Sequence, residues 1–183
     1  MLKSFPIARA GAATALALLA ATAARGAETL PALGCFARAY DKAHLSDHKN
    51  QIVDKAWLSI ERRKDTPPYP FLATLQFSVT GGGSSTFSTF GACKENDGGL
   101  SCNASLSAEE ADLCKKKGDG VRSCRIDYEH SGSFRIATQP EGVLVTVAER
   151  LELVGHDKYL YLSPDNCENH AFLLKPAPEA TCK

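Results

Sequence analysis

Three residues near the start of the chain, Asp41, His44 and His48, have side chains that bind metal ions or transfer protons. Their spacing of i, i+3 and i+7 places all three within about 60° of one face if the segment is helical. Two imidazoles one turn apart, with a carboxylate one turn before them, form a donor set that suits zinc or a similar divalent metal. The pattern lacks the glutamate that follows the first histidine of a metalloprotease helix, because Leu45 stands there.

A metal ion at this place needs a further ligand from elsewhere, such as His130, His156 or His170. Two other interpretations stay open. In one, His44 and His48 are surface or hydrogen-bonded residues of a short helix. In the other, one of them is a direct catalytic base. Elemental analysis of protein without a histidine tag tests the metal site, because absence of stoichiometric metal rules it out.

Two further pairs place a base near a nucleophile. Cys167 precedes His170 by three residues, a spacing that suits a thiolate–imidazole pair. His130 and Ser131 are neighbours, but neighbours on a strand point to opposite faces. The chain contains neither a Gly-x-Ser-x-Gly elbow nor a Cys-x-x-Cys motif. We therefore assign no catalytic residue, expect no cofactor other than a possible divalent metal, and lean against an enzyme.

The elements that must position these residues are mostly strands. A helix is expected over residues 37–48, and a second over 106–117, where Ser107 and Glu110 form a capping box. Within the extended segment 51–63, the only tryptophan, Trp57, is expected to anchor the sheet, on the face that also carries Val53. The full set of segments expected to be extended is 51–63, 71–80, 85–93, 100–105, 121–129, 133–139, 143–153, 158–162 and 171–175.

Short strands separated by turns indicate a mainly β fold. We expect a single antiparallel barrel or sandwich of about eight strands, with one or two short helices and disulfide bonds that hold it together. The glycine-rich segment 81–83 is followed by an extended segment rather than by a helix, which favours a turn over a phosphate-binding loop.

Seven cysteines indicate a disulfide framework with one cysteine left over. Cys93 and Cys102 flank a strong turn signal and could face each other across a hairpin. Cys114 and Cys124 flank a second loop rich in lysine and glycine. Cys35 and Cys182 lie near the two ends of the mature chain. Cys167 then remains unpaired, although the connectivity does not follow from the sequence alone.

The first 27 residues resemble an export signal, with Lys3 and Arg9 before an alanine-rich apolar run. Cleavage is expected between about residues 23 and 27, which leaves a single β-rich domain over residues 28–183 without a membrane span. The expected location is the bacterial periplasm or the medium, where disulfides persist. Removing the signal leaves 18 basic against 21 acidic residues, a balance that argues against a nucleic-acid partner.

The segment from Cys124 to Phe134, together with Cys35 and residues 40–48, resembles a group of small exported bacterial proteins of unknown function. In that group a cysteine stands where Tyr128 stands here, before an Asp-Gly-Gly-x-Phe run, and this chain departs at both points. The chain is also similar, in size and compartment only, to the periplasmic inhibitors of lysozyme, which are small disulfide-linked β-barrels. The resemblance implies no particular activity.

These observations favour an exported, non-enzymatic binding or inhibitor-type module. Its expected partner is a protein or small-molecule ligand of the cell envelope. Two alternatives remain. One is a metal-binding or metal-dependent hydrolytic protein that uses Asp41, His44 and His48. The other is a structural component of the envelope.

Overall fold

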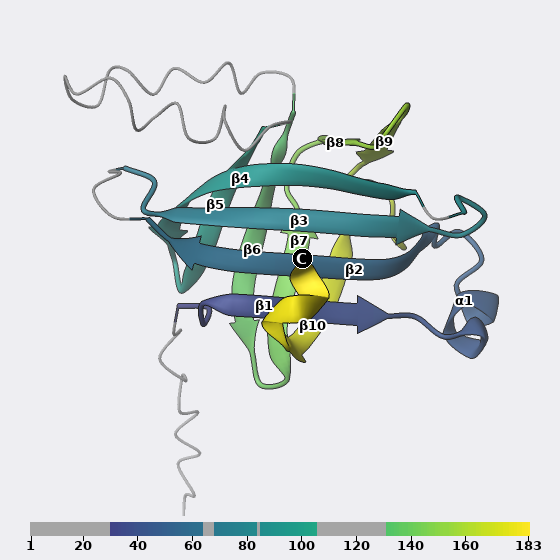
Figure 1. The fold of residues 1–183 in the computed structure, drawn as a ribbon, viewed down its shortest axis with the longest axis horizontal. Helices are drawn as coiled ribbons and strands as arrows, with labels where there is room; N and C mark the ends of the chain where they lie inside the picture. Colours follow the sequence, from purple (N-terminus) through teal and green to yellow (C-terminus); the bar gives the residue numbers. More distant parts are fainter. Residues whose placement is uncertain (1–29, 64–67, 84, 106–130) are drawn as a thin grey trace, which may run out of the picture.

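The computed structural model describes residues 30–63, 68–83, 85–105 and 131–183, and these residues form one antiparallel sheet closed into a barrel (Figure 1). Eight strands close the barrel in the order β1-β2-β3-β4-β5-β6-β7-β10, and β10 pairs with β1. Their bounds are β1 (Gly34–Ala39), β2 (Val53–Arg62), β3 (Phe71–Val79), β4 (Thr86–Asn96), β5 (Gly99–Ser105), β6 (Ser133–Gln139), β7 (Gly142–Val147) and β10 (Ala171–Ala177). The expected antiparallel barrel of about eight strands is confirmed.

Two short strands lie outside the closed ring. Strands β8 (Leu151–Val154) and β9 (Tyr159–Leu162) form a hairpin between β7 and β10 in the sequence. A single pairing, Ser88 with Val154, joins this hairpin to β4. Two helical segments complete the described chain: α1 (Lys42–Asp47) between β1 and β2, and the 3-10 turn η2 (Glu179–Cys182) after β10.

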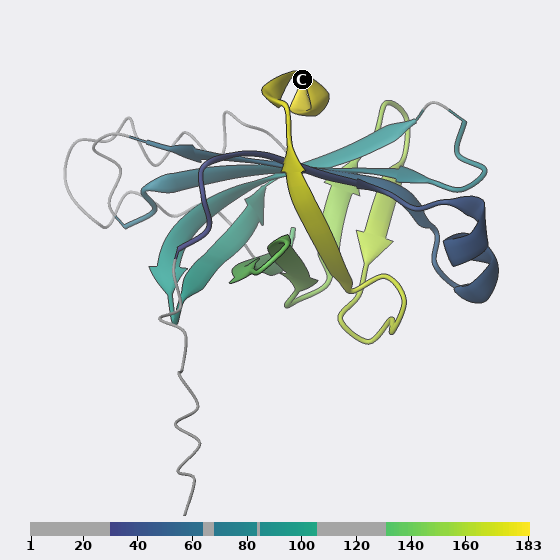
Figure 2. The ribbon, with the colours of Figure 1, turned by 90° about the horizontal axis from the view of Figure 1, so that it is seen from below.

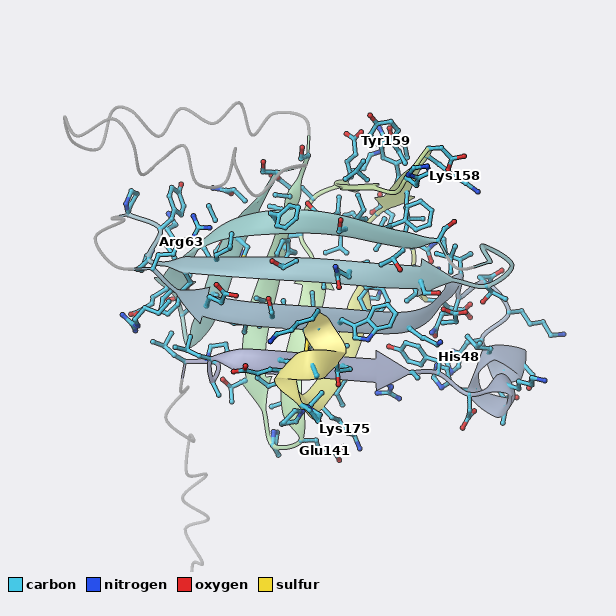
Figure 3. All side chains as sticks on the ribbon, viewed as in Figure 1. His48, Arg63, Glu141, Lys158, Tyr159 and Lys175 are labelled. Carbon is cyan, nitrogen blue, oxygen red and sulfur yellow. A yellow bond between two sulfur atoms is a disulfide. The ribbon has the colours of Figure 1, made fainter. Side chains whose placement is uncertain are left out.

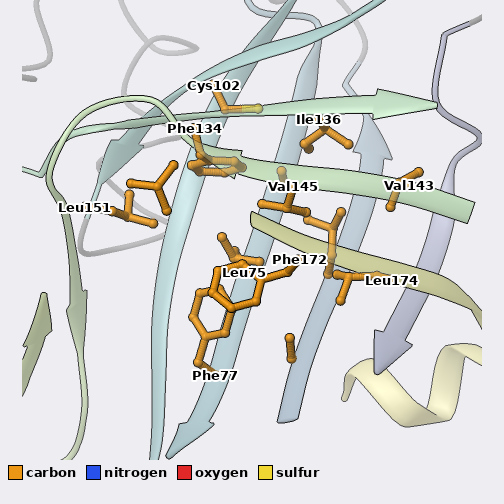
Figure 4. Packing of buried hydrophobic residues seen from close by; sticks show 14 of the residues in the cluster. Leu75, Phe77, Cys102, Phe134, Ile136, Val143, Val145, Leu151, Phe172 and Leu174 are labelled. Atoms are coloured by element: carbon orange, nitrogen blue, oxygen red, sulfur yellow. The ribbon is translucent and has the colours of Figure 1, made fainter. Parts of the chain in front are cut away.

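The barrel interior is filled with apolar side chains, as in other narrow barrels of eight strands. Along β3 the inward residues alternate as expected, and Phe71, Ala73, Leu75 and Phe77 are all buried. Figure 4 shows how Phe77 and Phe172 meet in the centre, where their ring centroids lie 4.8 Å apart. Side chains therefore occupy the interior of the described part of the barrel.

Strand β2 follows the predicted segment but not the predicted position of its tryptophan. Ala56, Leu58 and Ile60 face the core, whereas Trp57 is only partly buried on the outer face. A bulge between Val53 and Lys55 shifts the register, so that Val53 is fully buried instead of sharing the outer face with Trp57. The expected shared face of Trp57 and Val53 was wrong, because Val53 points inward with the aliphatic and phenylalanine side chains of the core and Trp57 does not.

Two other boundaries differ from those expected. The helix was expected to begin at residue 37, but residues 34–39 form strand β1, so the helical segment shortens to α1. The segment 143–153 was expected to be one strand, but it is divided into β7 and β8. The break falls where the chain leaves the ring, and the backbone nitrogens of Ala148 and Glu149 both donate to the carbonyl of Ser133.

Two of the expected disulfides are present. Cys93 and Cys102 are direct partners across the β4–β5 hairpin, whose turn places Asp97 and Gly98 at positive φ. Both cysteines are fully buried inside the barrel. Cys35 of β1 bonds to Cys182 of η2, and Figure 2 shows η2 on the outside of the barrel wall.

Several expectations fall on residues outside those described: the signal segment, the helix over 106–117, the strand over 121–129, the pair Cys114–Cys124, and His130. Within the described residues, no helix has the length and apolar character needed to cross a bilayer.

Candidate functional site

The histidine segment predicted from sequence lies on α1, at one end of the barrel (Figure 1). Asp41 is the N-cap residue, and its carboxylate accepts a hydrogen bond from the backbone nitrogen of His44 at 2.8 Å. His48 is the C-cap residue. The helix is only six residues long, so its cap is a main source of its order. The Asp41 carboxylate therefore serves the backbone of α1.

The two histidines are part of a continuous stack of planar groups. The ring centroids of His44 and His48 lie 4.3 Å apart, and those of Tyr40 and His44 lie 4.8 Å apart. The Arg38 guanidinium lies 4.8 Å from the centroid of Tyr40 and continues the stack toward the barrel. Burial raises the pKa of Tyr40 above its ordinary value, and the neighbouring Arg38 partly offsets this. The stack packs α1 against the mouth of the barrel.

Polar partners hold the outer end of this stack. The His44 Nε2 lies 3.0 Å from Oε1 of Gln51, and Gln51 Nε2 donates to the carbonyl of Val53. Because that donation turns the amide oxygen of Gln51 toward His44, the His44 Nε2 carries the hydrogen. The imidazole of His48 lies 4.0 Å from the carboxylate of Glu168, which also accepts a bond from the backbone of Asn50.

These contacts account for Asp41, His44 and His48 without a metal ion. Among the described residues, no group of three or more His, Cys, Asp or Glu side chains is placed to hold a metal. Of the histidines considered as further ligands, His170 bonds through Nδ1 to the carbonyl of Asn166, and His156 lies in the β8–β9 turn. The metal site remains a prediction of the sequence that the described geometry does not support.

Cys167 is exposed, and it pairs with none of the cysteines that the structure describes. It lies in the loop between β9 and β10, next to Glu168. His170, the predicted imidazole partner of the thiol, instead bonds to the Asn166 carbonyl at 2.9 Å. The loop is therefore organised around its backbone rather than around a thiolate–imidazole pair.

A hollow of about 530 Å³ lies outside the barrel, around the Cys35–Cys182 disulfide. Its lining mixes the acidic residues Glu61 and Glu179 with the basic residues Arg62 and Lys183. The guanidinium of Arg62 is held 4.7 Å from the ring centroid of Phe71. This mixed lining does not select for ligands of one charge.

The clearest surface for recognition is on the β8–β9 hairpin, which the sequence analysis passed over. Tyr159 and Tyr161 are 56% and 46% exposed and share the outer face of the hairpin with Glu152. Figure 3 shows Tyr159 and Lys158 on this hairpin, well separated from His48 on α1. We call the set Arg150, Glu152, Tyr159 and Tyr161 the tyrosine face. The alternation Tyr-Leu-Tyr-Leu was its only sequence signal.

Tyr161 is held in place from two sides. The Arg150 guanidinium lies 4.2 Å from its ring centroid, and its hydroxyl donates to the Glu152 carboxylate at 3.2 Å. Desolvation of the hydroxyl, together with the adjacent Glu152 carboxylate, raises the pKa of Tyr161 above its ordinary value. These two contacts orient the ring even though it is exposed.

Comparisons of the chain with family models, curated proteins and solved structures found no match. The chemistry of its surfaces is thus what bears on function.

Proposed function

We propose that this protein is an exported, non-enzymatic binding module that recognises another protein through the tyrosine face. The observation that carries the proposal is the pair of exposed tyrosines on a hairpin outside the closed barrel, one of them held between Arg150 and Glu152. Tyrosine and arginine are enriched among the residues that dominate binding energy in protein interfaces.

The arrangement lowers the cost of binding. A tyrosine has few rotatable bonds, and the contacts of Tyr161 with Arg150 and Glu152 restrict them before a partner arrives. A protein partner is favoured over a small ligand inside the barrel, because a cluster of buried apolar side chains occupies that space. The disulfides Cys35–Cys182 and Cys93–Cys102 suit an oxidising compartment, which supports export to the periplasm or the medium.

The test starts with capture of partners by residues 28–183, from periplasmic extract and from a panel of lysozymes. The affinity of each purified partner is then measured for the wild type and for the double variant Tyr159→Ser/Tyr161→Ser. Loss of two interface tyrosines is expected to weaken binding about 100-fold or more.

The matched control is Glu141→Ser/Lys175→Ser, which removes an exposed ion pair of 3.2 Å away from the tyrosine face (Figure 3). This variant should bind as tightly as the wild type. A partner that binds the tyrosine double variant with unchanged affinity contradicts the proposal. Absence of any partner favours the structural alternative.

A further inference from the structure

In the part of the chain that the structure describes, β9 is the last strand of the sheet and pairs with β8 alone. Strand β8 packs Leu151 and Leu153 on the core and pairs with a strand of the ring at one position, Ser88 with Val154. Among the described residues, no strand pairs with the other edge of β9, so that edge is open. An open edge offers unpaired backbone N–H and C=O groups to another chain.

The register shows which backbone groups those are. The nitrogen of Gly155 donates to the carbonyl of Lys158, so this pair is hydrogen-bonded at the turn. In an antiparallel hairpin, hydrogen-bonded and non-bonded pairs alternate. Leu160 and Leu162 therefore bond to β8, whereas Tyr159 and Tyr161, opposite Val154 and Glu152, direct their N–H and C=O groups to the open edge.

Tyr159 and Tyr161 thus expose both their rings and their unpaired backbone groups at this edge of β9. Natural proteins protect open edges with charged residues, proline or bulges along the strand. The four residues of β9 include no charged residue and no proline, and Lys158 stands just before them. Its short length is one natural protection of an edge, but the strand itself carries no charge, proline or bulge that would block pairing with another strand.

We propose that the partner docks by adding an extended segment to the β9 edge as a further strand. The inference rests on the proposed function and names the form of the partner. Side chains of the added strand alternate between the two faces of the hairpin. Those beside Tyr159 and Tyr161 are aromatic or β-branched, since such cross-strand pairs are the favourable ones, and those on the side of Leu160 are aliphatic. An acidic residue fits opposite Lys158.

A second copy of this chain is a poor occupant. Pairing two strands of four residues buries far less than the roughly 1,000 Å² of total area that a stable interface needs. A different protein can both add its strand and cover the rest of the tyrosine face.

The probe is a synthetic eight-residue peptide that alternates valine and tyrosine and ends in glutamate. Its control is the same peptide with methyl groups on the backbone nitrogens of the four central residues, which blocks pairing along both edges. Binding to isotope-labelled residues 28–183 is followed by NMR. The unmodified peptide should shift the amides of Tyr159 and Tyr161 and slow their hydrogen exchange, and methylation should weaken binding at least about tenfold.

Two protein variants separate the backbone from the ring. Tyr161→Thr removes the ring and keeps the N–H, whereas Tyr161→Pro removes both and breaks no bond to β8. Unchanged amide shifts of the barrel core confirm that each variant is folded. Strand addition predicts that Tyr161→Pro weakens peptide binding at least about tenfold more than Tyr161→Thr.

Three results overturn strand addition: no peptide binding at millimolar concentration, equal binding of the methylated peptide, or equal effects of the two substitutions. The proposed function survives all three if the tyrosine double variant still loses a protein partner. It fails separately if that variant keeps the partner.

Discussion

The side-chain oxygen of Asn169 accepts a hydrogen bond from the backbone nitrogen of Ile52 at 2.9 Å, across 117 residues of sequence. The same oxygen accepts from Val53 at 3.4 Å, and Asn169 Nδ2 donates to the carbonyl of Asn50 at 2.7 Å. Asn169 is fully buried. One amide thus joins the chain after α1 to the loop before β10, two segments that Figure 2 shows at the same end of the barrel.

Replacing this amide should therefore be costly. Asn169→Ala leaves two backbone N–H groups and one carbonyl without their partner, and each unsatisfied buried group costs about 1–3 kcal/mol. We expect the free energy of unfolding to fall by about 3 kcal/mol in urea denaturation. Asn103→Ala is the matched control, because Asn103 donates one side-chain bond, to Tyr69. Equal losses in the two variants would show that the additional hydrogen bonds of Asn169 do not add to stability.

The sequence alone cannot reveal the hydrogen bonds of Asn169, because the closure of the barrel brings their partners together. What the sequence predicts well is local. The alternation along β3 and the Asp97–Gly98 turn between Cys93 and Cys102 fix a strand, a hairpin and a disulfide without knowledge of other strands. Strand β1 escaped prediction because its Gly-Cys-Phe-Ala-Arg-Ala sequence has weak β preference, and pairing with β2 and β10 stabilises it.

The candidate sites show the same difference between local patterns, which the sequence reveals, and long-range contacts, which it does not. The helical face of Asp41, His44 and His48 is a local pattern, and α1 forms close to where it was expected. Whether such a face binds a metal depends on ligands from distant segments, which no local pattern provides. The Tyr159–Tyr161 alternation predicts a strand, but only the order of strands in the sheet makes that strand an exposed edge.

Gly91 is required by the packing inside the barrel. A Cβ at this position would lie 2.6 Å from Phe134 Cζ and 3.0 Å from Cys102 Cβ. Gly91→Ala should destabilise the fold by about 1–3 kcal/mol through overpacking. Phe134→Leu removes the clashing ring, so the double variant should lose less than the sum of the two single losses, as measured by chemical denaturation. Additive losses would mean that the methyl group is accommodated elsewhere.

The two disulfides should differ in their contribution to stability. Cys35–Cys182 spans 147 residues and Cys93–Cys102 spans nine. Chain entropy alone gives about 5 kcal/mol for the longer loop and about 2.7 kcal/mol for the shorter one. Unfolding in guanidinium should show a larger loss for Cys35→Ser/Cys182→Ser than for Cys93→Ala/Cys102→Ala. The reverse order would show that sulfur packing in the core outweighs loop closure, since Cys93 and Cys102 are buried inside the barrel.

Tyr40 should make the fold sensitive to alkali. Burial raises the pKa of its hydroxyl in the folded protein, with a smaller opposing effect of Arg38, so folding favours the neutral form. The contribution of the neutral Tyr40 hydroxyl to stability is complete below the unfolded pKa of about 10 and is lost as pH rises through the higher folded pKa.

Tyr40→Phe keeps the ring stacked between Arg38 and His44 but cannot ionise. Thermal unfolding between about pH 9 and 12 should therefore show a smaller loss of stability in Tyr40→Phe than in the wild type. Tyr159→Phe, at an exposed ring, should follow the wild type. If Tyr40→Phe loses stability in parallel with the wild type, the ionisation that opens the fold lies elsewhere and the Tyr40 stack does not limit stability in alkali.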